Sequence, residues 1–275
     1  MKKNKKSRLI LPVLLIIGII LSYVILRIYD KGNYSEKKDM EADKEQSDSD
    51  KSINKADLER YKKILLNAGT PDEVLADISD EQIAFIAKDI KRGDIYEDMD
   101  SFEFEDKLIS VTIICYSYEN NGEKQYKFFP SFRWLKAGYG IENDSFGFAV
   151  HEGWEIIPGM PAQTEVVCLK NSFEVKNIKI YEPIDASQYG YAYSFTNGIA
   201  MGDNYYEGYG VFYARKKEEN GENKISITYV HDSSSLINDV TYILSITPGL
   251  VSVSSDSSKI QVYENVMTLN INSHE

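Results

Sequence analysis

The stretch LISVTIICYSYENNGEKQYKFFPSFRWL, residues 108–135, decides the fold class of this chain. Two runs rich in β-branched and aromatic residues, 108–118 and 124–135, flank the turn sequence NNG at 120–122. An Asn-Gly pair between such runs is a strong signal of a β-hairpin, because both residues tolerate the positive φ angles of a tight turn. Apolar side chains of the first run fall on both faces, so we expect both faces to be at least partly covered.

The chain after residue 135 repeats this pattern of short strands and turns. Turn sequences such as Pro158-Gly159 and Asn197-Gly198 separate strand-like runs at 145–151, 153–157, 164–170, 173–181, 189–196, 205–215, 224–231, 240–247, 250–254, 259–263 and 266–271. Such spacing predicts a mainly β body over residues 94–275, built as an antiparallel β-sandwich. It is one large sandwich or two of immunoglobulin-like size divided near 182–188, and no internal repeat decides between them.

Residues 55–93 predict three short helices before the body. Apolar side chains recur at helical spacing, and Gly69 suits a left-handed helix end. Thr70 is expected as an N-cap with Pro71 at the first helical position, and Ser79 as the N-cap of the next helix. This helical neck either mediates oligomerisation or partner binding, or covers the sheet of its own chain. We favour the second alternative.

The start of the body is strongly acidic. It contains Asp94, Glu97, Asp98, Asp100, Glu103, Glu105 and Asp106. Hard cations take several oxygen ligands, but these residues match no established ligand spacing. We therefore expect no metal site here, and instead a solvated loop or an edge strand whose charges discourage pairing with other chains.

Residues 9–28 form an almost unbroken apolar run, long enough for one membrane-spanning helix. The run is longer than the core of a signal peptide, and no small-residue cleavage site follows it, so we expect an uncleaved anchor. Basic residues precede it, namely Lys2, Lys3, Lys5, Lys6 and Arg8. The positive-inside rule then predicts a cytoplasmic tail over 1–8 and an extracellular body. Residues 29–54 are polar, mixed in charge and without apolar periodicity, which is typical of a flexible linker.

Composition limits the partners. The chain has 31 Lys and Arg against 43 Asp and Glu, for a formal net charge of −12. Nucleic acid needs a basic footprint, so a nucleic-acid partner is excluded. The sequence contains no phosphate-binding loop and no Cys/His metal spacing, and we predict no cofactor.

No catalytic motif is present, and we name no catalytic residue. His151 is the best placed histidine, because Glu152 lies next to it and Gly153 permits a sharp bend. His231, beside Asp232, is discounted, because neighbours on a strand point to opposite faces. A histidine at the end of a strand more often has a structural role than a catalytic one.

Two cysteines, Cys115 and Cys168, lie in apolar strand runs, and the sequence leaves open whether they form a disulfide.

Tyrosines concentrate between residues 181 and 213. Alternation in YGYAYSF places Tyr189, Tyr191, Tyr193 and Phe195 on one face of a strand. The face is either core or an exposed ladder that stacks on sugar rings or a peptide. The candidate ligand-binding residues are Tyr189, Tyr191, Tyr193, Tyr205, Tyr206 and Tyr209.

Together these features predict a membrane-anchored, extracytoplasmic binding or interaction protein of a bacterial cell envelope, more readily than an enzyme. Its partner would be an envelope glycan or protein. One alternative is a hydrolase of envelope polymers that uses paired carboxylates such as Glu152 or Glu155. The other is an accessory or regulatory subunit of a membrane complex that acts through the anchor and the helical neck.

Overall fold

The structure is a computed structural model that describes residues 53–106, 108–136, 140–158, 163–170, 174–200, 204–218, 221–232, 243–254 and 260–271. They belong to one compact unit, Asp50–Glu275. The predicted tail and anchor, residues 1–28, lie outside the described residues, as does most of the linker. Within the described part, no helix combines the length and the apolar character needed to cross a membrane.

Three helices come first in the described chain: α2 (Lys55–Asn67), α3 (Asp72–Asp77) and α4 (Asp80–Asp89). Gly69 has φ +90° after α2, which confirms the predicted left-handed helix end. The Ser79 side chain accepts a hydrogen bond from the backbone N–H of Gln82 at 3.1 Å, which confirms Ser79 as the N-cap of α4.

The predicted cap of α3 is wrong. Pro71 occupies the N-cap position itself, with no side-chain cap, so it is not the first helical residue. The Thr70 hydroxyl is buried and hydrogen bonded to the Tyr116 hydroxyl at 2.8 Å. A tertiary partner on the sheet therefore replaces the local capping interaction of Thr70.

Fourteen strands follow in three sheets among the described residues. Sheet A has seven strands in the order β1-β2-β3-β10-β6-β7, with β5 also paired to β10. Their bounds are β1 (Ile95–Glu103), β2 (Ile109–Asn120), β3 (Glu123–Trp134), β5 (Trp154–Ile156), β6 (Gln163–Lys170), β7 (Glu174–Tyr181) and β10 (Asn204–Lys216).

Sheet B has five strands in the order β14-β11-β4-β9-β8, and β12 and β13 form a two-stranded sheet C. Their bounds are β4 (Gly140–Val150), β8 (Asp185–Ser187), β9 (Gly190–Ala200), β11 (Lys224–Asp232), β12 (Ile243–Thr247), β13 (Leu250–Ser254) and β14 (Ile260–Thr268). All of the paired strands run antiparallel.

The hairpin that decides the fold class is confirmed. Strands β2 and β3 pair from Ile109 with Trp134 to Asn120 with Glu123. The two turn residues, Asn121 and Gly122, have φ +54° and +81°. Two consecutive positive φ angles match the right-handed twist of the flanking strands, as the Asn-Gly signal predicted.

Strands from both halves of the body share the same sheets. Strand β10 lies between β3 and β6 in sheet A, and β9 pairs with β4 in sheet B. The chain therefore builds one sandwich across the 182–188 region rather than one on each side of it. Two local predictions are wrong. Asn197-Gly198 is no turn but continues β9, beside an irregular register with β4. The two runs predicted at 259–263 and 266–271 are not separate strands, because the single strand β14 (Ile260–Thr268) continues from one into the other.

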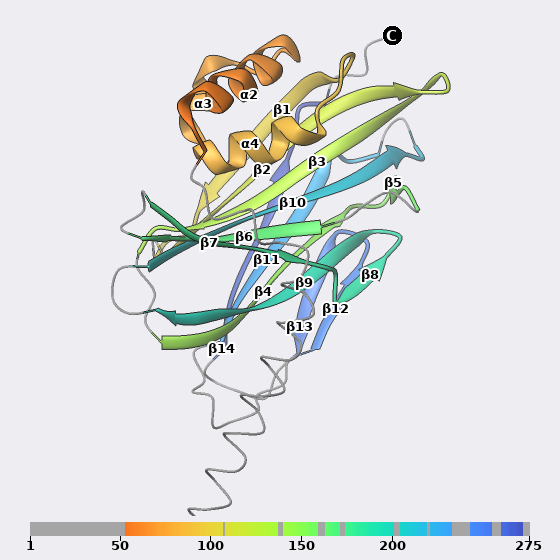
Figure 1. Ribbon diagram of the computed structural model, residues 1–275. Helices are drawn as coiled ribbons and strands as arrows, with labels where there is room; N and C mark the ends of the chain where they lie inside the picture. Colours follow the sequence, from red (N-terminus) through yellow and green to blue (C-terminus); the bar gives the residue numbers. More distant parts are fainter. Residues whose placement is uncertain are drawn as a thin grey trace, which may run out of the picture. The chain divides into compact units, whose positions relative to one another are not determined.

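The sandwich core lies between sheets A and B, and the helices cover the outer face of sheet A (Figure 1). Buried aromatic side chains fill the inner core; Phe128, Phe148 and Phe212, for example, stack with centroid distances of 4.6–4.9 Å. On the outer face, Phe85 of α4 packs against Phe129 and Tyr209. The helical neck thus covers the sheet of its own chain, the alternative that the sequence favoured.

The acidic segment forms edge strand β1, and two of its carboxylates bond to the edge of the other sheet. Asp100 accepts the backbone N–H of Thr268 at 3.0 Å, and Asp98 accepts that of Asn270 at 2.6 Å. These bonds satisfy the backbone N–H groups of Thr268, in edge strand β14, and of Asn270, just after it. They connect the edges of sheets A and B along one side of the sandwich. The sequence favoured a solvated loop or an edge strand here, and the structure shows the edge strand β1 with a structural role for these two carboxylates.

The cysteines are too far apart to be bonded. Cys115 lies on β2 and Cys168 on β6, with β3 and β10 between them. Three strand spacings amount to about 14 Å, twice the largest Cα separation that a disulfide spans. Cys115 is a free, fully buried thiol, and burial raises its pKa well above the ordinary value. It is therefore an unreactive core residue.

A buried carboxylate lies beneath the first turn of α4. Glu207 of β10 pairs with Arg133 of β3, with 3.0 Å between Arg133 Nε and Glu207 Oε2. Glu81 of α4 faces this pair, and burial together with the charge of Glu207 raises the pKa of Glu81 above its ordinary value of 4.5. A carboxyl group with a raised pKa favours the folded state when it is protonated and disfavours it when ionised.

We expect Glu81→Gln to raise the melting temperature at neutral pH, because the variant removes the ionised form that the fold disfavours. The gain is lost as the pH falls below about 4.5, where Glu81 is protonated in both states. Thermal unfolding of both proteins across this pH range measures the effect. Glu73→Gln, in the exposed first turn of α3, is the matched control and should not gain stability at either pH.

Candidate functional site: an acidic hollow around His151

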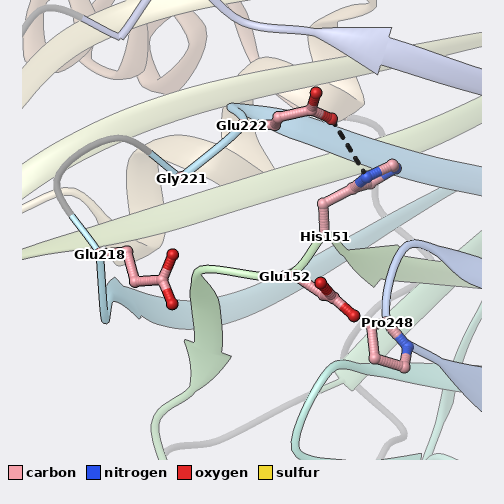
Figure 2. A pocket seen from close by; sticks show the side chains of 6 residues that line it. All are labelled: His151, Glu152, Glu218, Gly221, Glu222 and Pro248. Carbon is pink, nitrogen blue, oxygen red and sulfur yellow. Dashed lines mark ion pairs between the residues drawn. The ribbon is translucent and has the colours of Figure 1, made fainter.

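An open-sided hollow of about 330 Å³ lies where three turns of the sandwich meet (Figure 2). It is lined by His151, Glu152, Glu218, Gly221, Glu222 and Pro248. His151 and Glu152 follow β4, Glu218 follows β10, and Pro248 lies in the turn between β12 and β13. The hollow therefore gathers side chains from across about 100 residues of sequence.

Close backbone contact between two of these turns sets the shape of the hollow. Gly153 has φ +90°, and a Cβ at this position would lie 2.8 Å from the Cα of Gly221. The backbone N–H of Lys217 bonds to the carbonyl of Gly153 at 2.7 Å. Only glycine fits this approach without strain, and the sharp bend predicted at Gly153 is confirmed.

His151 is a partly buried side chain with an asymmetric environment. Its Nδ1 lies 3.7 Å from Glu222 Oε2, and its side chain is 25% exposed. Its Nε2 is buried and has no hydrogen-bond partner among the described residues. Burial lowers the pKa of His151 below the ordinary value of 6.5, although the nearby Glu222 opposes the shift. The ring is therefore neutral at neutral pH.

The hollow carries excess negative charge. Three carboxylates, from Glu152, Glu218 and Glu222, face one nearby ammonium group, Lys224, which lies 2.9 Å from Glu222. The hydrogen bond from Lys224 lowers the pKa of Glu222, so that carboxylate is ionised. Such a surface repels anions and favours a positively charged group of a ligand.

The chemistry needed for nucleophilic catalysis is not assembled in this hollow. None of its described lining residues carries a hydroxyl or thiol nucleophile. The separation of 3.7 Å between His151 and Glu222 also exceeds a hydrogen bond, so Glu222 does not orient the ring as a catalytic carboxylate would. No group of three or more His, Cys, Asp and Glu residues suited to a metal ion occurs in the described part of the chain.

The two carboxylates of the hydrolase alternative have different environments. Glu152 lines the hollow, whereas Glu155 on β5 pairs with Arg215 at 2.6 Å and Lys217 at 2.8 Å. Hydrogen bonds from Lys217 and Arg215 lower the pKa of Glu155. A glycosidase acid needs a raised pKa, so Glu155 is unsuited to that role.

The predicted tyrosine site is largely core. Tyr193, Tyr206 and Tyr209 are buried, and Tyr189 and Tyr191 are half-buried against the inner core. The predicted shared face is confirmed for the first strand, since Tyr193 and Phe195 join the inner core with those two residues. The side chain of Tyr205 lies outside the described residues. Tyr193, Tyr206 and Tyr209 therefore cannot belong to an exposed ladder of aromatic rings.

Sequence reasoning missed a second polar cluster, which is buried between the sheets. Asp144 on β4 is opposite His231 on β11, and Asp144 Oδ1 lies 3.0 Å from His231 Nδ1. The other carboxylate oxygen accepts the Tyr229 hydroxyl at 2.5 Å, and Trp134 Nε1 donates to that hydroxyl at 2.9 Å. The pairing partner of His231 is therefore on the neighbouring strand, and not its sequence neighbour Asp232.

No protein-family model and no curated protein matches this chain. Among solved structures, a pore-forming protein is similar at 10% identity and a TM-score of 0.34, covering 63% of this chain and 90% of that one. The collagen-binding domain of surface protein RspB from Erysipelothrix rhusiopathiae has 12% identity and a TM-score of 0.27, covering 57% and 64%. The collagen-binding domain of a Staphylococcus aureus adhesin has 5% identity and a TM-score of 0.26, covering 62% and 95%. These TM-scores are too low for the similarity to carry an argument about function.

Proposed function

We propose that this chain is a membrane-anchored binding or interaction protein, with its body on the outer side of a bacterial cell membrane. The observation that carries the proposal is the order of its parts: a basic tail, one apolar run at 9–28, a polar linker and a compact unit from Asp50 onward. In this proposal the folded unit, Asp50–Glu275, is the part of the chain that meets a partner.

The described part of the body supports binding over hydrolysis. The hydrolase alternative requires a cleft with two carboxylates and a raised pKa on one of them. Around His151 the carboxylates with shifted pKa, Glu155 and Glu222, are both shifted downward by cationic partners. The partner would be an envelope glycan or protein, and the acidic hollow favours one that presents an amino or guanidinium group.

Location is tested first, with a membrane-impermeant amine reagent applied to intact cells that produce the full chain. We expect labelling of lysines in the body, such as Lys217 and Lys224, whose side chains are 43% and 37% exposed. The four lysines before the apolar run, Lys2, Lys3, Lys5 and Lys6, serve as the internal control and should react only after lysis. Labelling of both groups only after lysis would contradict the extracytoplasmic body.

Binding is tested by capture from envelope extract with the full chain in detergent, beside the double variant Glu152→Gln, Glu218→Gln. We expect a discrete glycan or protein partner, and weaker capture by the variant if the partner carries a positive charge into the hollow. The matched control is Glu73→Gln, a neutralised carboxylate at an exposed helix start. Release of soluble fragments from the extract would instead favour the hydrolase. Loss of capture on replacing residues 9–28 by an unrelated membrane helix would favour the accessory subunit.

A further inference from the structure

The hairpin β12–β13 is attached to sheet B from outside. Its strands form a two-stranded sheet of their own, and it packs with Ile246 and Val251 against Ala149 and Ala192 of sheet B. Val251 is fully buried in this contact. Such a small cluster makes the hairpin a unit that can open at a lower free energy than the sandwich core.

Small residues on sheet B form the seat of the hairpin. A Cβ placed on Gly147 would lie 2.8 Å from Cγ1 of Val251 and 3.6 Å from Cβ of Ala192. Gly147 therefore leaves the space that the Val251 side chain occupies. The seat is apolar, and Ile246 and Val251 of the hairpin cover it together with the partly buried Tyr189.

Among the described residues, three hydrogen bonds fix the hairpin to the sheet, and two of them involve the turn. The backbone N–H of Gly249 donates to the carbonyl of Val150 at 2.8 Å, and the Ser226 hydroxyl donates to the carbonyl of Gly249. The Thr228 hydroxyl donates to the carbonyl of Val251 at 3.2 Å. The position of Gly249 therefore decides whether the hairpin stays docked.

The turn rests directly on the His151 ring. Gly249 has φ +66°, and a Cβ there would lie 2.7 Å from Nε2 and Cδ2 of His151. That same Nε2 is buried without a hydrogen-bond partner among the described residues. A protonated ring would place an N–H donor and a positive charge against the backbone of the turn, where Nε2 has no hydrogen-bond partner among the described residues. Docking of the turn and protonation of the ring therefore oppose each other.

Charged groups around the ring come from each neighbouring element. Glu222 at 3.7 Å favours the protonated ring, as does Glu152 at the end of β4, while Lys224 of β11 disfavours it. Glu218 lies across the hollow, and the turn itself contributes only the uncharged Pro248 and Gly249. Burial outweighs the carboxylates and lowers the pKa of His151.

We propose that His151 is a pH-sensitive latch for the hairpin β12–β13, and that a proton on its ring releases the turn and uncovers the apolar seat on sheet B. Release lets water reach Nε2 and supplies the acceptor that the docked state withholds. A histidine whose pKa is lower in the docked state stabilises docking above its ordinary pKa of 6.5, and this stabilisation is lost as the pH falls. The hairpin is thus docked at neutral pH and opens in acid.

Hydrogen–deuterium exchange on the full chain in detergent tests the latch, with exchange times scaled to the intrinsic rates at about pH 7.5 and about pH 5. We expect the protection of amides in 243–254 to fall at the lower pH. Protection in β2 and β3 should not change. In His151→Phe, whose ring stays neutral, the hairpin should remain protected at both pH values.

Two further variants separate a latch from a merely structural histidine. Glu222→Gln removes the carboxylate that favours the protonated ring in the docked state. The pKa of docked His151 then falls further below that of the released state, so release should move to higher pH. Gly249→Ala forces the turn off the ring and should expose the hairpin at both pH values. Equal hairpin protection at both pH values in the unmodified chain would overturn the proposal. So would an unchanged release pH in Glu222→Gln, which also decides the matter if His151→Phe fails to fold.

Discussion

Replacing Lys127 by Met is expected to lower the free energy of unfolding by about 3–5 kcal/mol, because it leaves a buried carboxylate without its cation. Lys127 Nζ is 2.6 Å from Asp94 Oδ2, and the two side chains are 2% and 5% exposed. The ammonium group also donates to the backbone carbonyl of Asp89 at 2.7 Å. The Tyr213 hydroxyl in turn donates to Asp89 Oδ1 at 2.6 Å.

This buried pair connects three elements. Lys127 lies on β3, Asp89 ends α4, and Asp94 precedes β1. The rings of Tyr118 and Tyr213 flank the ammonium group, with centroids 5.3 and 5.8 Å from Nζ. Water is excluded from the pair, so the loss of Lys127 is not compensated by solvent. The helices should consequently detach from sheet A at a lower denaturant concentration in Lys127→Met.

Chemical denaturation followed by circular dichroism measures this loss. Lys217→Met is the matched control, since Lys217 pairs with Glu155 at 2.8 Å but is 43% exposed, and we expect a much smaller loss of stability because solvent screens this pair. Adding Asp94→Asn to Lys127→Met should recover part of the stability by removing the orphaned charge. Equal losses in Lys127→Met and Lys217→Met would show that the buried pair contributes no more than a surface one.

Features set by neighbouring residues were predictable from the sequence. The β2–β3 hairpin follows from Asn121 and Gly122, whose backbone preferences fix the turn and hence the register of both strands. The Ser79 cap of α4 likewise depends on a hydroxyl and an N–H three residues apart. In both cases the interacting groups are adjacent in the chain, so no knowledge of the fold is needed.

Features set by distant partners were not predictable. Alternation places Tyr193 on one face of β9, but it does not reveal that sheet A covers that face. Asp98 and Asp100 were visible as acidic residues, while their backbone partners lie 172 and 168 residues away. Thr70 has an ideal cap sequence, yet its hydroxyl bonds to Tyr116 on the sheet. A tertiary contact thus replaced the local one.

The candidate site also combines features set by sequence neighbours with features set by distant residues. His151 and the bend at Gly153 were apparent from the sequence, because the glycine follows the histidine by two positions. The companions Glu218, Glu222 and Pro248 come from other turns, which only the strand order brings together. Sequence reasoning therefore located the histidine and could not identify the groups that control its protonation.

Replacing Asp144 by Ala is expected to lower the free energy of unfolding by about 3 kcal/mol or more, because the buried groups of Tyr229, His231 and Asp232 lose their shared hydrogen-bond partner. Asp144 is fully buried and accepts the Tyr229 hydroxyl, while its other oxygen lies 3.0 Å from His231 Nδ1. Asp144→Asn keeps one carbonyl oxygen and should lose less, about 1–2 kcal/mol. The graded loss would show that hydrogen bonding, rather than side-chain volume, gives Asp144 its importance.

Trp134 reports on this cluster directly, because its indole donates to Tyr229 and lies 5.4 Å from the His231 ring. In a Trp154→Phe background Trp134 is the one remaining tryptophan of the chain, and its emission should shift in Asp144→Ala under native conditions. Asp106→Ala is the matched control: Asp106 also accepts a tyrosine hydroxyl, from Tyr263 at 2.8 Å, but is exposed. We expect it to cost less than about 1.5 kcal/mol and to leave the emission unchanged. If Asp144→Ala were no more destabilising than Asp106→Ala, the buried network would contribute nothing beyond an exposed hydrogen bond, and His231 would be an ordinary core residue.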